Sequence, residues 1–308
     1  MRATFAVACL TGLLACRAAP PTDSEHGPPQ TLSLLGEPLR APPLTSERRA
    51  QLTRDLEWAA ARLAAEPRSE QAFIWLGRRH AYLGEYRTAI DVFSAGLALH
   101  PRSHKLLRHR GHRHITLREL DAAVADLSLA AQLISGLPDE VEPDGAPNAL
   151  GIPTSTSHGN IHYHLGLAHY LRGDFERALA SYRECARFDT NDDMRCATAY
   201  WTYMILRRLG HPAAARVVLQ KIDADMTVIE NHAYHRLLLL FAGELDEREL
   251  LASVERGTVA GPTTLYGLGS WHLFEGRDER AQRVFEEIVE GGIWPAFGHV
   301  AAEAELGR

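Results

Sequence analysis

The sequence predicts an all-α protein: a solenoid of about six helical hairpins with a capping helix at each end. Small residues recur about 34 positions apart, since Gly77 is matched by Gly111 and Ala89 by Ala123. A period of that length is typical of stacked helix-turn-helix units. Glycines also end short amphipathic segments and supply the left-handed turn, with an alanine five residues later in most cases. These pairs are Gly84 with Ala89, Gly173 with Ala178, Gly210 with Ala215 and Gly276 with Ala281, while Gly243 lacks the alanine.

This register resembles that of tetratricopeptide repeats over roughly residues 70 to 290. The resemblance implies a protein-binding scaffold rather than an enzyme, with no cofactor and with the first helix of each unit lining a concave groove. It implies how the protein binds and leaves the identity of the partner open.

The first residues resemble the signal peptide of a bacterial lipoprotein. Met1 and Arg2 precede an apolar run that ends near Ala15 and is too short to span a bilayer. Cys16 directly follows Leu-Leu-Ala, as in the lipobox of such proteins. The resemblance implies removal of residues 1–15, a lipid on Cys16 and a periplasm-facing place in the cell envelope. Arg17 stands where an Asp would favour the inner membrane, which favours the outer one. The alternative is an ordinary signal peptide with Cys16 incidental.

The elements then follow in order. Residues 16–44 are rich in Pro and poor in periodic apolar positions, which predicts a disordered tether. The solenoid is expected over residues 45–308. A capping helix begins at Thr45 or Ser46 and runs to about Ala65, and a last one runs from Pro295 towards Leu306. The six units between them start near residues 70, 104, 159, 196, 229 and 262.

One step between units is much longer than the period. Units two and three start 55 residues apart, which leaves an inserted loop at about residues 135–158. Four prolines exclude a helix there, and its first half holds Asp139, Glu140, Glu142 and Asp144. A loop of this length is usually functional or disordered. Two hypotheses remain open: a lid that crosses a basic groove as an internal mimic of an acidic ligand, or a solvated excursion.

Composition excludes some classes of function. The net charge of −6 argues against nucleic-acid binding. Beyond the lipobox, Cys185 and Cys196 are the remaining cysteines, and Cys185 stands at a small-residue position of the repeat. We expect two buried free thiols rather than a disulfide.

The family resemblance places specific side chains in the concave groove. Arginines beside tyrosines suit recognition of carboxylates, so we expect a protein or an extended, acidic peptide as the ligand. The expected groove residues are Arg78, Tyr82, Lys105, Arg108, His112, Asn160, Tyr163, Tyr170, Tyr200, Arg207 and Arg208.

Sixteen histidines raise the alternative of a metal or acid-base site. Four of them occupy the aromatic position 11 of their units and are interpreted as packing residues: His80, His114, His169 and His272. His109, His112 and His164 lie on neighbouring first helices, and Asp139 or Glu142 of the insert would complete such a site between units two and three. The sequence has no HExxH, CxxC or phosphate-binding loop.

The leading hypothesis is therefore a lipid-anchored adaptor of the cell envelope, without catalytic residues or a metal. The alternatives are the metal-dependent or acid-base enzyme and a purely architectural protein. Pathway, oligomeric state and final membrane stay open.

Overall fold

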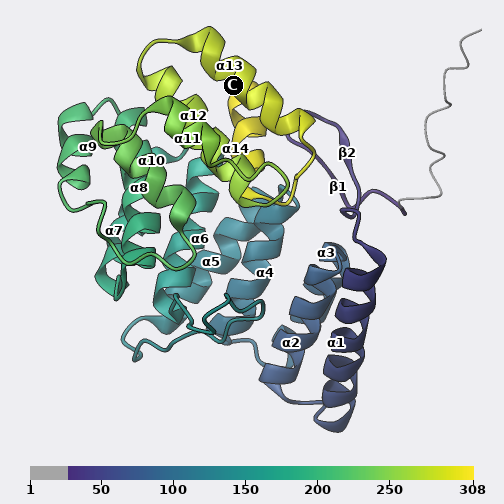
Figure 1. The fold of residues 1–308 in the computed structure, drawn as a ribbon. Coiled ribbons are helices and arrows are strands. Elements are labelled where there is room, and N and C mark those ends of the chain that lie inside the picture. Colours follow the sequence, from purple (N-terminus) through teal and green to yellow (C-terminus); the bar gives the residue numbers. More distant parts are fainter. Residues whose placement is uncertain (1–26) are drawn as a thin grey trace, which may run out of the picture.

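The computed structural model describes residues 27–308. The expected signal peptide, the lipid attachment at Cys16 and the first part of the tether lie outside the described residues. Within them the chain forms fourteen α-helices and one short two-stranded sheet, so the all-α solenoid is confirmed (Figure 1). No helix in this range is long and apolar enough to cross a bilayer.

Six helical hairpins follow a capping helix, α1 (Ser46–Ala65). In chain order they are α2 (Glu70–Tyr82) with α3 (Tyr86–Leu99), α4 (His104–Thr116) with α5 (Leu120–Ile134), α6 (Ser157–Arg172) with α7 (Phe175–Cys185), α8 (Asp192–Arg208) with α9 (Pro212–Leu219), α10 (His232–Ala242) with α11 (Glu247–Ala252), and α12 (Ala260–Phe274) with α13 (Asp278–Glu290). A short 3-10 turn, η1 (Ala186–Phe188), follows α7. The first helices α2, α4, α6, α8, α10 and α12 pack side by side and form what we call the inner face.

Local chemistry sets the ends of these helices. The first helices of units one to four are each capped by a side-chain oxygen that accepts from a backbone N–H three residues on, namely Ser69, Ser103, Thr156 and Asn191. The turn glycines have positive φ, from 69° at Gly276 to 83° at Gly173. In unit two the same position is Arg118, which adopts a φ of 63° without being glycine.

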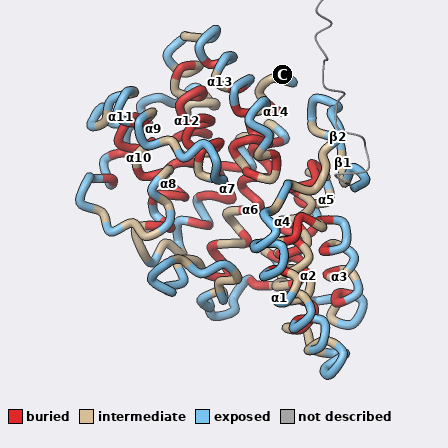
Figure 2. Tube along the Cα trace, turned by 45° about the vertical axis from the view of Figure 1, so that its right-hand side comes forward, coloured by how far each residue is buried: buried red, intermediate tan, exposed pale blue. Residues whose placement is uncertain are grey.

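The recurring glycines of the first helices make room for a large side chain of the second helix. A Cβ on Gly77 would lie 2.3 Å from the Phe93 ring, and one on Gly166 would lie 2.5 Å from the Tyr182 ring. The three atoms nearest to a Cβ on Gly77 all belong to the Phe93 ring. Buried residues gather along these helix contacts (Figure 2), and Cys185 and Cys196 are buried free thiols.

The described part of the predicted tether is an ordered strap, residues 27–44, which corrects the expectation of disorder there. Its strands β1 (Thr31–Leu32) and β2 (Pro38–Leu39) pair with each other. Gln30 accepts from the backbone N–H of Tyr86 at 2.7 Å, and Thr31 donates to the carbonyl of Leu117 at 2.7 Å. Composition predicted disorder because the strap lacks an apolar core, but backbone and side-chain hydrogen bonds to two repeat turns hold it in place.

The last helix, α14 (Phe297–Leu306), does more than cap the end of the stack. It packs on α12 and α13 and also reaches α6 on the inner face. Its Glu303, fully buried, accepts from Arg118 Nε at 3.0 Å and from the backbone N–H of Leu34 at 2.9 Å. Arg118 also donates to the carbonyl of Trp294 at 2.9 Å. Helix α14, the α4–α5 turn and the strap therefore meet at one buried carboxylate.

Candidate functional site

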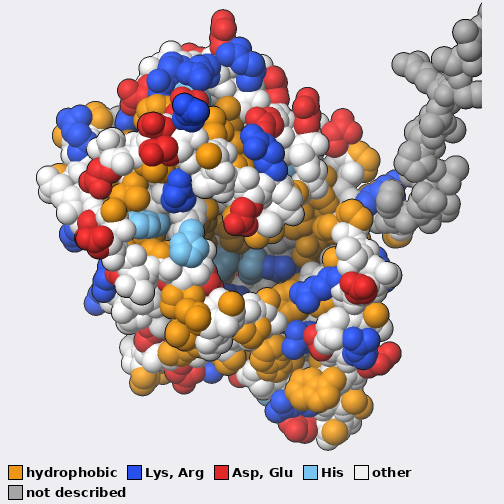
Figure 3. Space-filling view, viewed as in Figure 1, with side chains coloured by type: hydrophobic (Ala, Val, Ile, Leu, Met, Phe, Trp, Pro, Cys, Tyr) orange, Lys and Arg blue, Asp and Glu red, His pale blue; other side chains and the backbone are white. Residues whose placement is uncertain are grey.

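The insert, residues 135–156 between α5 and α6, lies against the inner face. Val141 pairs with Thr156 in an antiparallel bridge, so this part of the insert is extended. Lys105 Nζ binds Glu140 at 2.8 Å, and Arg108 binds Glu142 at 3.0 Å. The insert therefore places two of its acidic side chains on cations of α4. Figure 3 shows the inner face as a hollow with histidine and cationic side chains at its floor.

Three guanidinium groups gather where α2 meets α4, and we call Arg78, Arg108 and Arg113 the cationic cluster. They line a cavity of about 140 Å³ with Tyr82 and His112, and none of its lining residues is acidic. Among the described residues, only Arg108 of the three forms an ion pair.

The surroundings of Arg113 and Arg108 explain the charge state of these two side chains. Burial lowers the pKa of Arg113 to about 10, with Arg108 and Arg78 adding to the effect and the Tyr86 ring, 5.6 Å away, opposing it. Burial also lowers the pKa of Arg108, which Glu142 partly restores. Both side chains remain cationic at neutral pH, and the buried Nε of Arg108 has no hydrogen-bond partner. Such a cluster favours the binding of an anion.

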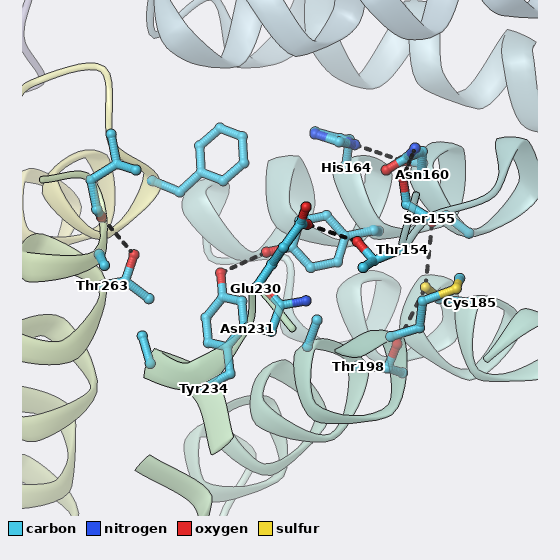
Figure 4. A pocket seen from close by; sticks show the side chains of 18 of the residues that line it. Thr154, Ser155, Asn160, His164, Cys185, Thr198, Glu230, Asn231, Tyr234 and Thr263 are labelled. Carbon is cyan, nitrogen blue, oxygen red and sulfur yellow. Dashed lines mark hydrogen bonds between the residues drawn. The ribbon is translucent and has the colours of Figure 1, made fainter. Parts of the chain in front are cut away.

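A larger pocket of about 480 Å³ continues the hollow beyond His112, which lines both cavities. We call it the inner pocket (Figure 4). The first turns of α6, α8, α10 and α12 and the start of α14 contribute its walls, because the parallel first helices begin at the same edge of the stack. Tyr163 and Tyr234 form one wall and share a hydrogen bond of 2.8 Å between their hydroxyl oxygens.

The polar groups of the inner pocket carry little charge. Its one acidic side chain is Glu230, which accepts from Asn148 at 2.6 Å and from Thr154 at 2.7 Å of the insert. Burial holds the pKa of His112 and His164 well below the usual value, with nearby arginines adding to the effect, so both imidazoles are neutral. Their ring centroids lie 4.4 Å apart, with the ring planes tilted by 38°. The inner pocket therefore suits an uncharged group with an apolar body.

The residues of the metal alternative do not assemble into a site. No group of three His, Cys, Asp or Glu side chains within residues 27–308 is placed to hold a metal ion. Asp139 accepts from the backbone N–H of His158 at 3.0 Å and so anchors the start of α6. The Nδ1 of His164 contacts the carbonyl of Asn160 at 2.6 Å, and Arg108 donates to Nδ1 of His109 at 2.9 Å. His109, His112 and His164 are thus engaged in packing and hydrogen bonds, and Glu142 pairs with Arg108.

The expected groove residues divide into three groups. Arg78, Tyr82, Lys105, Arg108, His112, Asn160 and Tyr163 line the inner pocket or the neighbouring cavities. Tyr170 and Tyr200 are fully buried and do not line a groove, which corrects that expectation.

Of the two remaining cations, helix α14 binds Arg208, and the end of α12 binds Arg207. Arg208 pairs with Glu305, and Tyr266 donates to the same carboxylate at 3.0 Å. Arg207 donates to the carbonyl of Phe274 at 2.7 Å. The sequence placed these arginines in the groove but gave no sign that the chain's own last helix would bind Arg208.

Sequence reasoning missed Arg113 and Phe297 as site residues. Arg113 follows His112 on the same helix, and a denser count of cations on α4 could have indicated it. Phe297 reaches the site only because α14 folds back, with its ring 5.2 Å from that of His112. No local pattern signals that contact.

Comparisons with known proteins address the repeats themselves. Two family models described as tetratricopeptide repeat match residues 74–138 and 159–192. The solved structure of YrrB, described as a tetratricopeptide-repeat protein with an unusual peptide-binding site, is 12% identical, with a TM-score of 0.43; the match covers 77% of this chain and 93% of that chain. The tetratricopeptide-repeat domain of P58(IPK) is also 12% identical, with 83% and 93% covered and a TM-score of 0.22. No curated protein matches the chain.

Proposed function

We propose that this chain, whose residues 74–138 and 159–192 match tetratricopeptide-repeat models, is a lipid-anchored adaptor of the cell envelope. It binds an extended, acidic segment of a partner protein on its inner face. The lipid on Cys16 tethers it to the membrane, which we take to be the outer one, and the repeats face the periplasm. No catalytic step is required.

The cationic cluster is the observation that supports this proposal. Arg78 and Arg113 have no ion pair among the described residues, although the whole chain is acidic. Keeping three guanidinium groups together costs electrostatic free energy, since like charges repel in a partly buried site. An incoming carboxylate would offset that cost and accept hydrogen bonds from more than one arginine.

The inner pocket gives the partner a second point of attachment. It adjoins the cationic cluster through His112 and offers tyrosine rings and amide groups rather than charge. We assign it to an uncharged side chain of the same bound segment. The protein would then recognise a segment in which an acidic side chain lies beside an uncharged, apolar one.

The first test measures the binding of extended peptides of varied acidic content to the purified chain. Removing the charge of Arg113 (Arg113→Gln) is expected to lower the affinity for acidic peptides by about tenfold or more, because a hydrogen bond to a charged group contributes roughly 1.5–3 kcal/mol. The exposed Arg102 provides the matched control, and Arg102→Gln is expected to leave the affinity within about twofold. Equal affinity for acidic and neutral peptides, unaffected by Arg113→Gln, would reject the proposed ligand class.

The anchor needs its own test. Labelling of cells with a radioactive fatty acid is expected to mark the wild-type chain and not the Cys16→Ser variant. Membrane fractionation of both forms then reports the location. A labelled variant, or an unlabelled wild type, would contradict the anchor.

A further inference from the structure

Residues 139–146 of the insert are themselves an extended acidic segment bound to the inner face. The backbone N–H of Glu142 donates to the carbonyl of Ser155 at 3.0 Å, and that of Ser157 donates to the carbonyl of Glu140 at 2.8 Å. These bonds hold the segment as a strand, so the side chains of Glu140 and Glu142 point to the same side. That side carries the cations Lys105 and Arg108.

The backbone of the segment is also recognised. Arg78 donates to the carbonyl of Pro143 at 2.8 Å, and Arg79 donates to the carbonyl of Gly145 at 3.4 Å. At Gly145 a Cβ would come within 2.1 Å of the Tyr82 hydroxyl and 2.4 Å of Arg78. The segment therefore fits against this wall closely, as a bound peptide does.

The insert nevertheless has no hydrophobic core of its own. Its large apolar side chains are exposed to solvent, as shown by Val141 at 62%, Leu150 at 66% and Ile152 at 49%. The pair between Lys105 and Glu140 is also exposed, and such pairs contribute little to stability. The partly enclosed pair between Arg108 and Glu142, together with the backbone contacts, provides most of the attachment. A segment attached by polar contacts alone can be replaced by another that offers the same groups.

We propose that residues 139–146 are an intramolecular stand-in for the partner, which rests on the adaptor function proposed above. The partner segment is extended and carries acidic side chains two residues apart, and it binds by displacing the insert from Arg78, Lys105 and Arg108. Displacement frees Arg78 and Arg108 of the cationic cluster, and Arg113 lies beside them without an ion pair among the described residues. While the insert occupies the inner face, it lowers the apparent affinity for any peptide that binds weakly, because only the fraction of protein molecules with a displaced insert can bind.

The probe for this proposal is a synthetic peptide of residues 138–146, PDEVEPDGA, compared with the same peptide carrying Gln at both glutamates. The protein is the full chain without its signal peptide. A tethered segment acts at an effective concentration of the order of millimolar, so the wild type is expected to bind the peptide weakly. The variant Glu140→Gln/Glu142→Gln weakens the insert and is expected to bind the acidic peptide at least about tenfold tighter. Its affinity for the Gln peptide should stay low.

Two variants control for general effects. The first control replaces two exposed glutamates, Glu57 of α1 and Glu66 directly after it. Glu57→Gln/Glu66→Gln makes the same change in net charge away from the insert and is expected to leave the affinity unchanged. Adding Arg108→Gln to the insert variant should abolish the gain, since the ligand then loses its main cation. If the double variant is too unstable to study, Glu140→Gln alone removes only an exposed pair, and it is expected to raise the affinity by up to about fivefold.

The outcomes separate this inference from the proposed function. If other acidic peptides bind in an Arg113-dependent manner, but the insert variants bind no peptide tighter than the wild type does, the stand-in is rejected and the adaptor remains. If no acidic peptide binds any form of the protein, both proposals fail. Tighter binding of the acidic peptide alone, lost with Arg108→Gln, supports both.

Discussion

The histidines at position 11 of the repeat show how one residue type serves different roles along one chain. In units one and two the imidazole binds a glutamate five residues later, His80 to Glu85 at 2.7 Å and His114 to Glu119 at 2.6 Å. His169 has Asp174 in the same place, at 3.6 Å. The sequence interpretation of packing residues was therefore incomplete, because the imidazoles of His80 and His114 also tie the end of a first helix to the turn. The recurring spacing of five was visible in the sequence.

His164 has a different environment, and its charge state makes stability depend on pH. Burial of His164 holds the pKa of its imidazole well below the usual value, and the nearby Arg108 and Arg113 lower it further. The hydrogen bond to the carbonyl of Asn160 acts in the opposite direction. His109 and His112 also face the ring of His164. The unfolded chain takes up a proton near pH 6.5, whereas the folded chain does not. The contribution of His164 is therefore complete above that pH and is lost as the pH falls further.

This predicts a specific effect of His164→Gln. Between pH 7 and pH 5 the free energy of unfolding should fall less in the variant than in the wild type, by about 1–2 kcal/mol. Urea unfolding at several pH values measures the difference. The exposed His211 provides a control, since His211→Gln should leave the pH dependence as in the wild type. Parallel curves for His164→Gln and the wild type would contradict the prediction.

At the scale of the helical hairpin, the recurring glycines of the first helices set how closely the two helices approach. Replacing Gly77 by alanine places a Cβ 2.3 Å from the Phe93 ring, which is itself fully buried and cannot move aside freely. Overpacking of this kind costs about 1–3 kcal/mol and outweighs the gain of up to about 1 kcal/mol from the helix propensity of alanine. Gly77→Ala should therefore destabilise the protein in urea unfolding.

Gly257 offers the matched control for that measurement. No atom lies within 4 Å of a Cβ added there, and its φ is not in the left-handed region. Gly257→Ala is expected to leave the free energy of unfolding within about 0.5 kcal/mol. A Gly77→Ala protein as stable as this control would show that the hairpin can widen at little cost.

The repeat elements could be predicted from the sequence because their signals are local and recur. Glycine spacing and capping residues such as Ser69 and Ser103 place the helices within a few positions. The path of the insert could not be predicted in the same way, since it depends on Arg78 and Lys105 of earlier helices. Arg118 differs from the turn glycines that occupy the same position in the other repeats. It has a side chain and therefore adopts a positive φ that is unfavourable, and that side chain donates a hydrogen bond to Glu303.

At the scale of the whole molecule, the chain departs from a simple solenoid, in which each repeat contacts only its neighbours. Arg118 and Glu303 lie 185 residues apart in sequence and are both almost completely buried. Burial alone would raise the pKa of Glu303, but hydrogen bonds from His299 and Arg118 hold it below the usual value, so the carboxylate is charged. No periodic pattern announces such a contact, which explains why the sequence predicted a plain cap for α14 and a free tether for the strap.

Breaking this contact should open the molecule locally rather than unfold it uniformly. Arg118→Met leaves Glu303 charged and buried beside His299 and the backbone N–H of Leu34, and removing one partner of a buried pair costs about 3–5 kcal/mol. Helix α14 and the strap both depend on that carboxylate, whereas the hairpin α6–α7 retains its own core contacts. Hydrogen exchange should therefore accelerate in residues 31–39 and 297–306 and stay slow in residues 161–171.

A second variant distinguishes the effect of the ion pair on stability from the effect of side-chain packing. Replacing both partners, as Arg118→Met/Glu303→Leu, removes the uncompensated charge and is expected to recover much of the lost stability, because apolar groups of similar size can substitute for a buried pair. The strap would still lack the acceptor for Leu34, so residues 31–39 should remain less protected than in the wild type while residues 297–306 regain protection. Uniform acceleration across all hairpins in Arg118→Met would instead mean that the contact stabilises the solenoid as a whole. Because α14 covers Arg208, local opening would add that arginine to the cations already present on the inner face.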